Sequence, residues 1–129
     1  MAITQAVANS FKTEVLTAVH NFTASTGDTF KIALFTNSAT LSKATTAYST
    51  SNEVSGTGYT AGGNSLTSVT PVLSTDTAVC DFADSSWTTA TITARGALIY
   101  NSSESDKAVV VLDFGGDKTS TAGTFTIQF

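Results

Sequence analysis

Residues 64–129 alternate between short runs rich in β-branched and aromatic residues and short polar segments. Such runs are typical of strands, and the polar segments between them are typical of turns. Together with residues 29–36, they predict about seven short strands, the spacing expected of an antiparallel β-sandwich or jelly roll. The strands are expected at residues 29–36, 64–72 with a break at Pro71, 78–82, 87–94, 97–100, 108–114 and 123–129.

The turns are expected at residues 83–86, 101–106 and 115–118, and a bulge or bend is expected at Arg95 and Gly96. Residues 108–114 are continuously apolar, which predicts a strand that is covered on both faces. In residues 78–82 the alternation places Cys80 and Phe82 inward. Cys80 is the only cysteine, so no intrachain disulfide can form and we expect a buried apolar residue there.

One apolar stripe near the N-terminus has helical spacing. Its members recur every three or four residues, and they are Val7, Phe11, Val15, Val19 and Phe22. We therefore predict one amphipathic α-helix over residues 7–22, with Asn9 or Ser10 as its N-cap. The chain is expected to form a single domain over residues 1–129, with an N-terminal arm and helix (1–27) and a β-rich body (28–129).

Two segments interrupt the strand pattern. Residues 37–52 form a long polar connection whose only large apolar residues are Leu41 and Tyr48, and long loops of this kind are often functional. Residues 53–63 contain four of the nine glycines, which permit tight reversals or close approach of another backbone. A phosphate-binding loop is the weaker interpretation, because a strand-like pattern and not a helix follows.

Charged residues are scarce, at 12% of the chain, and the net charge is −4. The six lysine and arginine residues are scattered singly, so we expect no direct nucleic acid partner. Serine and threonine make up roughly a third of the chain, and a hydroxyl-coated surface suits subunits that pack side by side. We find no secretory signal and no apolar stretch of membrane-spanning length.

No set of residues with a recognisable catalytic or metal-binding spacing is present, so we expect no enzymatic activity, no cofactor and no metal site. His20 is expected at the surface or as a cation at the helix C-terminus. A carboxylate pair among Asp81, Asp84, Asp113 and Asp117 is the enzymatic alternative, and turn capping explains the same residues more simply. Weak Ca²⁺ binding is a further alternative, and it would use acidic turn residues among Asp76, Asp81, Asp84, Glu104 and Asp106.

The aromatic residues allow two interpretations. A sugar-stacking platform could use Trp87, Tyr48, Tyr59 and Tyr100, but in a β-domain of this size such rings are more often buried. We therefore favour core or interface positions for them.

The sequence resembles small structural proteins of tailed bacteriophages, including capsid decoration or cement proteins, over nearly its whole length. The segments that carry the resemblance are residues 9–12, 20–22, 30–36, 94–100, 113–116 and above all Glu53-Val54-x-Gly56-x-Gly58-Tyr59. The resemblance implies a virion component that is assembled in the bacterial cytoplasm. It supplies no catalytic residue.

From this resemblance we expect a capsid decoration or cement protein that binds at capsomer junctions. Its partners would be the major capsid protein and itself, as a homotrimer. The alternative is a tail, baseplate or fibre-associated module that acts as an adaptor or binds a host glycan. The candidate contact residues lie in residues 1–9, the 37–52 loop and the glycine stretch, and they are Ile3, Val7, Leu41, Tyr48, Val54, Gly56, Gly58 and Tyr59.

Overall fold

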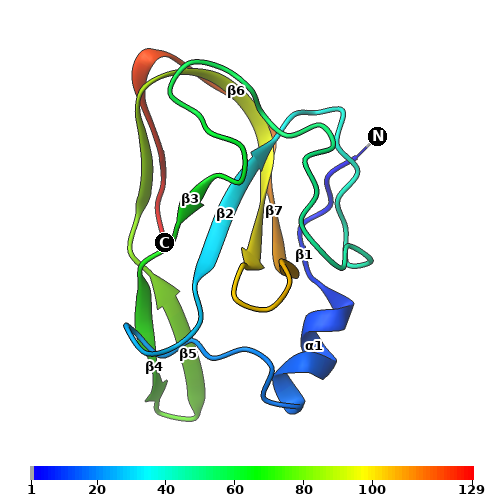
Figure 1. The fold of residues 1–129 in the computed structure, drawn as a ribbon, viewed down its shortest axis with the longest axis vertical. Helices are drawn as coiled ribbons and strands as arrows, with labels where there is room; N and C mark the ends of the chain where they lie inside the picture. Colours follow the sequence, from blue (N-terminus) through cyan, green and yellow to red (C-terminus); the bar gives the residue numbers. More distant parts are fainter. Residues whose placement is uncertain (1) are drawn as a thin grey trace.

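The computed structural model describes residues 2–129, and Met1 lies outside the described residues. The chain is mainly β, with antiparallel sheets that pack together and one short helix, as expected for a β-sandwich (Figure 1). A five-stranded sheet has the order β1-β7-β6-β2-β3, and β4 and β5 form a separate two-stranded sheet. The elements are β1 Ala6–Val7, α1 Asn9–Leu16, β2 Phe30–Phe35, β3 Asn64–Ser65, β4 Ser68–Ser74, β5 Thr77–Phe82, β6 Ser85–Asn101 and β7 Lys107–Ile127.

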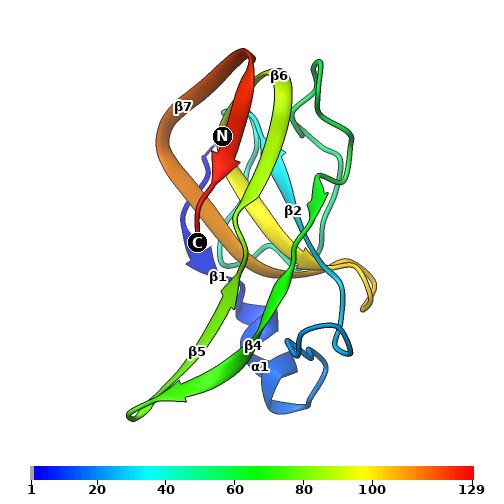
Figure 2. The same ribbon diagram turned by 90° about the vertical axis from the view of Figure 1, so that its left-hand side faces the viewer.

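β6 and β7 form one long hairpin that bends back over the sheet (Figure 2). Register shifts interrupt their pairing, including one between Ala94 and Gly96, where a bend is predicted. An extra residue on one strand bends a hairpin without ending it. The predicted turn at residues 115–118 is wrong, because β7 continues through these residues. Residues 87–94 and 97–100, predicted as two strands, are parts of the single strand β6.

The half of this hairpin next to its turn, residues 96–101 of β6 and 107–113 of β7, is covered on both faces, and so is β2. Phe30, Ile32 and Leu34 of β2 belong to one apolar cluster, which Trp87 and Phe125 of the far half of the hairpin complete. Neighbouring residues of β2 and β7 point into a second cluster, whose other side is formed by the N-terminal segment and the 37–52 loop. The expectation that residues 108–114 form a strand covered on both faces is confirmed, because Val109 belongs to the first cluster and Ala108 and Val111 to the second.

β4 and β5 form a hairpin, residues 68–82, that we call the β4–β5 arm. It extends away from the body at the same end of the molecule as α1, and the arm and α1 lie on opposite sides of that end (Figures 1 and 2). The predicted break at Pro71 is a bulge, since the register shifts between Val69 and Val72. The expectation that Cys80 is buried is wrong: it is exposed, because no second layer covers this part of the arm.

The helix is shorter than the apolar stripe predicts. It ends at Leu16, and Ala18 has a φ of 59°, a left-handed conformation that a right-handed helix does not contain. The predicted caps Asn9 and Ser10 are wrong, since Ala8 holds the N-cap position and makes no side-chain cap. Within residues 2–129 no helix is both long and apolar enough to span a membrane.

Candidate interaction surfaces

The carboxylate of Glu53 fastens the glycine stretch to the sheet. It accepts hydrogen bonds from the Tyr48 hydroxyl at 2.7 Å, the Tyr59 hydroxyl at 2.6 Å and the Gly62 backbone N–H at 2.7 Å. The Tyr59 hydroxyl also accepts the backbone N–H of Leu34 at 2.9 Å. Hydrogen bonds to an ionised acceptor are among the stronger ones in proteins. The glutamate and the tyrosine of the Glu-Val-x-Gly-x-Gly-Tyr pattern therefore have a structural role, which is to hold this loop against β2.

Two glycines of the stretch are required by close approach. A Cβ on Gly63 would lie 1.8 Å from the carbonyl oxygen of Ile32, and a Cβ on Gly58 would lie 2.8 Å from the Cα of Ala90. Both glycines also have a positive φ, of 73° and 83°. Larger residues cannot occupy these positions without moving the backbone of a neighbouring strand, so the glycines let the loop lie directly on the sheet. This confirms the expectation of close backbone approach.

The tyrosines around Glu53 are held in their neutral form. Burial raises the pKa of Tyr59 and of Tyr48, and the hydrogen bond that each donates to Glu53 raises it further. Burial also raises the pKa of Tyr100 to about 12, with the charges of Asp106 and Glu53 adding to it. The Tyr100 hydroxyl donates to the carbonyl oxygen of Gly62 at 2.7 Å, and its ring stacks on that of Tyr48 at 4.5 Å between centroids. The three tyrosines and Glu53 thus form one connected support.

The 37–52 loop is tied to the body by backbone hydrogen bonds. The Leu41 N–H donates to the carbonyl oxygen of Ala2 at 3.1 Å, and the Leu41 carbonyl oxygen accepts the Thr4 N–H at 2.9 Å. Tyr48 N–H donates to Asp106 at 2.9 Å. The loop folds around a depression of about 490 Å³ on its outer side. Its lining is rich in hydroxyls, with Phe35, Ser38, Thr40, Leu41, Ser42, Ala44, Thr45, Thr46, Ala47, Ser49, Ser51 and Asn52.

The N-terminal segment is not a free arm over its described residues. Ile3 and Ala8 are buried in the second apolar cluster, and β1 pairs with β7 through Ala6 to Val111 and Val7 to Val110. The N-terminal arm expected from the sequence is therefore attached to the body over its described residues, and the part of that expectation that falls on Met1 lies outside the described residues.

The predicted contact residues divide into two groups. Ile3, Leu41 and Val54 are buried, and Tyr48 and Tyr59 are half-buried in the support around Glu53. Val7, Gly56 and Gly58 are exposed and open to a partner. The aromatic platform is also placed inside, since Trp87 and Tyr100 are buried. This confirms the preference for core positions over a sugar-stacking surface.

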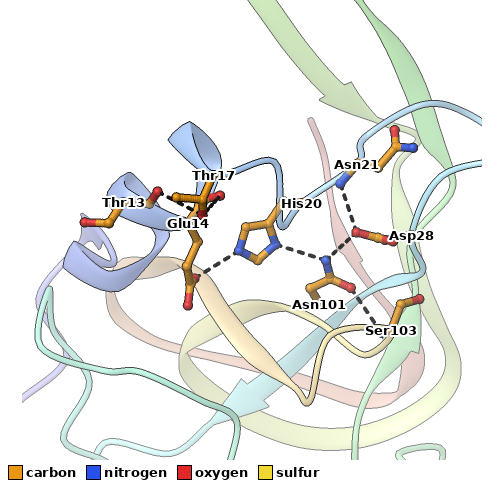
Figure 3. Close-up of polar contacts among 8 residues, drawn as sticks. All are labelled: Thr13, Glu14, Thr17, His20, Asn21, Asp28, Asn101 and Ser103. Carbon is orange, nitrogen blue, oxygen red and sulfur yellow. Dashed lines mark hydrogen bonds and ion pairs between the residues drawn. The ribbon is translucent and has the colours of Figure 1, made fainter.

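His20 lies in a buried polar cluster at the end of β6 (Figure 3). Its side chain is fully buried, so the surface position expected from the sequence is wrong. Its Nε2 lies 3.0 Å from Glu14 Oε1, and its Nδ1 lies 3.0 Å from Asn101 Nδ2. An amide nitrogen only donates, so Nδ1 accepts and Nε2 carries the hydrogen that it shares with Glu14. The ring therefore links α1 to the sheet.

Asn101 is the centre of this cluster and has no exposed surface. Its Nδ2 also donates to Asp28 Oδ2 at 2.8 Å, and its Oδ1 accepts the Ser103 N–H at 3.0 Å. Asp28 in turn accepts the backbone N–H of Asn21 at 2.9 Å. The cluster holds residues 18–29 in place as the chain passes from α1 to β2. No local sequence pattern predicts this cluster, because Asn101 and His20 lie 81 positions apart.

Among the other carboxylates considered from the sequence, two share one cation and two cap backbone N–H groups. Asp113 and Asp117 both lie 3.8 Å from Arg95, whereas Asp84 accepts the Phe129 N–H and Asp81 accepts the N–H of Phe82. Across residues 2–129, no three His, Cys, Asp or Glu side chains are grouped so that they could hold a metal ion. Asp113 and Asp117 are thus brought together as ion-pair partners of Arg95, and Asp81 and Asp84 as caps of backbone N–H groups.

An apolar groove of about 640 Å³ lies between the β4–β5 arm, α1 and the sheet. Its walls are apolar except for Asp81, and they are formed by Val7, Phe11, Val15, Phe22, Pro71, Ala78, Val79, Cys80, Asp81, Phe82, Ile99, Val109, Val110, Leu112 and Phe129. Sequence reasoning missed this surface. The available signal was the run from Val69 to Val79, which has apolar residues on both strand faces.

Comparisons with protein-family models, with curated proteins and with solved structures found no match.

Proposed function

We propose that the protein is a bacteriophage virion structural protein, a capsid decoration or cement protein that stabilises the head by binding at capsomer junctions. The observation that carries this proposal is the rigid support of the 37–52 loop and the glycine stretch. Glu53 joins the two segments through three short hydrogen bonds, and residues 41 and 48 are bonded to the body. A loop surface that is ordered before binding loses little conformational entropy when a partner covers it.

The surface chemistry fits repeated packing against a large partner. In the 37–52 loop the only charged side chain is Lys43, and the remaining exposed residues are largely serine, threonine and alanine. Burying hydroxyls that find a hydrogen-bond partner costs far less than burying charges. An interface of ordinary size, about 1,600 Å² in total, would then need no exceptional contact, because the gain is multiplied by the number of copies. The resemblance to small virion proteins of tailed phages names the large partner as the major capsid protein.

The direct test is the number of copies in a purified particle. We expect hundreds of copies per virion by quantitative mass spectrometry, in a fixed ratio to the major capsid protein. About a dozen or fewer copies, as a cyclic ring at a portal or tail would contain, would contradict the proposal.

A variant links the copy number to the loop surface. Ala44 is exposed and lines the loop depression, so Ala44→Asp places a charge there without changing the core. We expect this variant to bind undecorated heads at least about tenfold more weakly. Thr121→Asp on β7 adds the same charge at an exposed position outside the loop and should bind like the parent protein.

The alternative is a tail, baseplate or fibre-associated module that acts as an adaptor or binds a host glycan. The hydroxyl-lined depression of about 490 Å³ is the observation that favours it, because its volume falls within the range of small-ligand sites. Glycan-array binding by the isolated protein, with antibody labelling confined to the tail, would select this alternative. A silent array with even labelling of the head would select decoration.

A further inference from the structure

The side chains of His20, Asn101 and Asp28 join separate parts of the chain, and we call these three residues the His20 clasp (Figure 3). Asn101 is the last residue of β6, and Asp28 precedes β2. On its other side His20 contacts α1, where Glu14 Oε1 lies 3.0 Å from Nε2. The clasp therefore fastens α1 and residues 18–29 to the end of the sheet.

The orientation of the Asn101 amide is fixed by two partners other than His20. Its Oδ1 accepts the Ser103 N–H at 3.0 Å, and its Nδ2 donates to Asp28 Oδ2 at 2.8 Å. A flipped amide would place oxygen against the carboxylate and nitrogen against the N–H, which loses both bonds. The nitrogen must therefore face His20, and only an unprotonated Nδ1 can accept it. The clasp closes on a neutral ring whose single N–H, on Nε2, donates to Glu14.

The charged groups around the ring do not supply a second acceptor at Nδ1. Glu14 lies at Nε2, away from Asn101, and Asp28 already accepts the Asn101 amide and a backbone N–H. From β2 it is the Phe30 ring that lies beside His20, at 6.3 Å between centroids. Within residues 2–129, the other charged residues of α1, of β2 and of residues 102–107 make no hydrogen bond or ion pair with the clasp, and they are Lys12, Lys31, Glu104, Asp106 and Lys107.

We propose that the His20 clasp is opened by acid. A second proton on Nδ1 would face the Asn101 amide hydrogens at 3.0 Å between the nitrogens, so the ring must leave Asn101 to bind it. An imidazole in water takes up this proton at about pH 6.5. The closed clasp excludes the proton and the open form binds it, so the clasp is most stable above this pH and weakens as the pH falls below it. The ratio of open to closed molecules should rise about tenfold between about pH 7.5 and 5.5.

Opening of the clasp changes the surface of the protein. Phe22 lies between His20 and Asp28 in the chain, and its ring stacks on that of the fully buried Phe30 at 4.2 Å between centroids. The same segment holds the base of the β4–β5 arm, because the Ala24 N–H donates to the Thr70 hydroxyl at 3.0 Å. When residues 18–29 are released, Phe30 is uncovered and the arm loses this bond. The change does not depend on what the protein binds.

Hydrogen exchange of single amides measures the opening. The N–H groups of Asn21 and Asp28 report on it, since the first donates to Asp28 Oδ2 and the second to the Asn21 carbonyl oxygen. After correction for the intrinsic exchange rate, we expect the protection factors of both to fall about tenfold between about pH 7.5 and 5.5. Leu98, paired with both β2 and β7, is the control and should keep its protection. Protection of Asn21 and Asp28 that stays constant or rises over this range would overturn the proposal.

His20→Asn separates the ring from the carboxylates around it. The Oδ1 of an asparagine can accept the Asn101 amide in place of Nδ1, and it takes up no proton. We expect the protection of the Asn21 and Asp28 amides in this variant to be independent of pH over the same range. The same fall in protection as in the parent protein would assign the change to carboxylates and contradict the proposal.

The parent protein alone also decides the question, whether or not the variant folds. His20 is the only histidine, so the imidazole nitrogen signals in an NMR spectrum belong to it. At about pH 7.5 we expect a neutral ring with its hydrogen on Nε2. As the pH falls, a charged ring should appear only together with the loss of amide protection. A charged ring at about pH 5.5 in molecules whose Asn21 and Asp28 amides remain fully protected would show that the closed clasp accepts the proton, and the proposal would be wrong.

Discussion

Replacing Glu53 with alanine should strongly destabilise the fold, although the residue is not in the apolar core. The carboxylate accepts three hydrogen bonds, at 2.7 Å, 2.6 Å and 2.7 Å, and each hydrogen bond to a charged group contributes about 1.5–3 kcal/mol. Tyr48 is half-buried and can turn its hydroxyl to water, so we count the full cost only for Tyr59 and the Gly62 N–H. The expected loss in the free energy of unfolding is about 3–6 kcal/mol.

Two further substitutions calibrate this value. The Tyr59 hydroxyl and the Gly62 N–H both donate to Oε1, so Glu53→Gln can keep these two bonds but removes the charge. Because neutral hydrogen bonds contribute about half as much as bonds to a charged group, we expect about half of the loss, about 1.5–3 kcal/mol. Glu104→Ala removes a carboxylate that makes no side-chain hydrogen bond or ion pair within residues 2–129. Its effect should stay within about 0.5 kcal/mol.

Urea unfolding followed by tryptophan fluorescence measures these differences. Trp87 is the only tryptophan, it is buried, and its ring lies 5.9 Å from that of Tyr59 between centroids. The signal therefore comes from the region that Glu53 supports. A loss of less than about 1 kcal/mol in Glu53→Ala, the size of a typical neutral hydrogen bond, would refute the idea that this carboxylate fastens the loop.

Three other predictions concern the same framework. Because the folded-state pKa values of Tyr48, Tyr59 and Tyr100 are raised above 10.0, their contribution to stability is complete below about pH 10 and is lost as the pH rises through the folded-state values. An ultraviolet absorbance titration should show late ionisation coupled to unfolding, and a tyrosine that ionises normally in the folded protein would contradict this. Asn101→Ala should cost about 3 kcal/mol in urea unfolding because three hydrogen bonds and a buried site are lost, against about 0.5 kcal/mol for Asn37→Ala at an exposed single bond. Equal losses would show that the cluster around His20 does not stabilise the fold. Gly63→Ala should cost about 3 kcal/mol or more in the same assay, since the new Cβ meets the Ile32 carbonyl, whereas Gly116→Ala meets nothing within 4 Å and should be nearly neutral. A stable Gly63→Ala protein would mean that the loop does not lie on β2 as described.

Local alternation was sufficient to predict the β class and most strand positions. In β2, Phe30, Ile32 and Leu34 face one cluster while Ala33 and Phe35 face the other, as the period of two requires. Alternation does not show which face is covered, however. For this reason the same rule placed Cys80 inside, although the arm has no second layer over it.

Long-range contacts account for the remaining differences. A Gly-Gly pair is compatible with a turn and with a bulge, so the pair at residues 115 and 116 does not predict that β7 continues through it. The helix ends at Leu16, and His20 beyond it is bonded to Asn101, which lies far away in the sequence. The role of Glu53 was equally hidden, because its partners are brought together only when the loop folds onto β2. The apolar groove needed the relative position of α1 and the arm, which no local pattern contains.

A cryo-EM map of the intact particle tests the central claim most directly. The account predicts density of this fold at the capsomer junctions over the whole head, with the 37–52 loop against the capsid. Density confined to the tail or baseplate, or a head without this fold at its junctions, would contradict it.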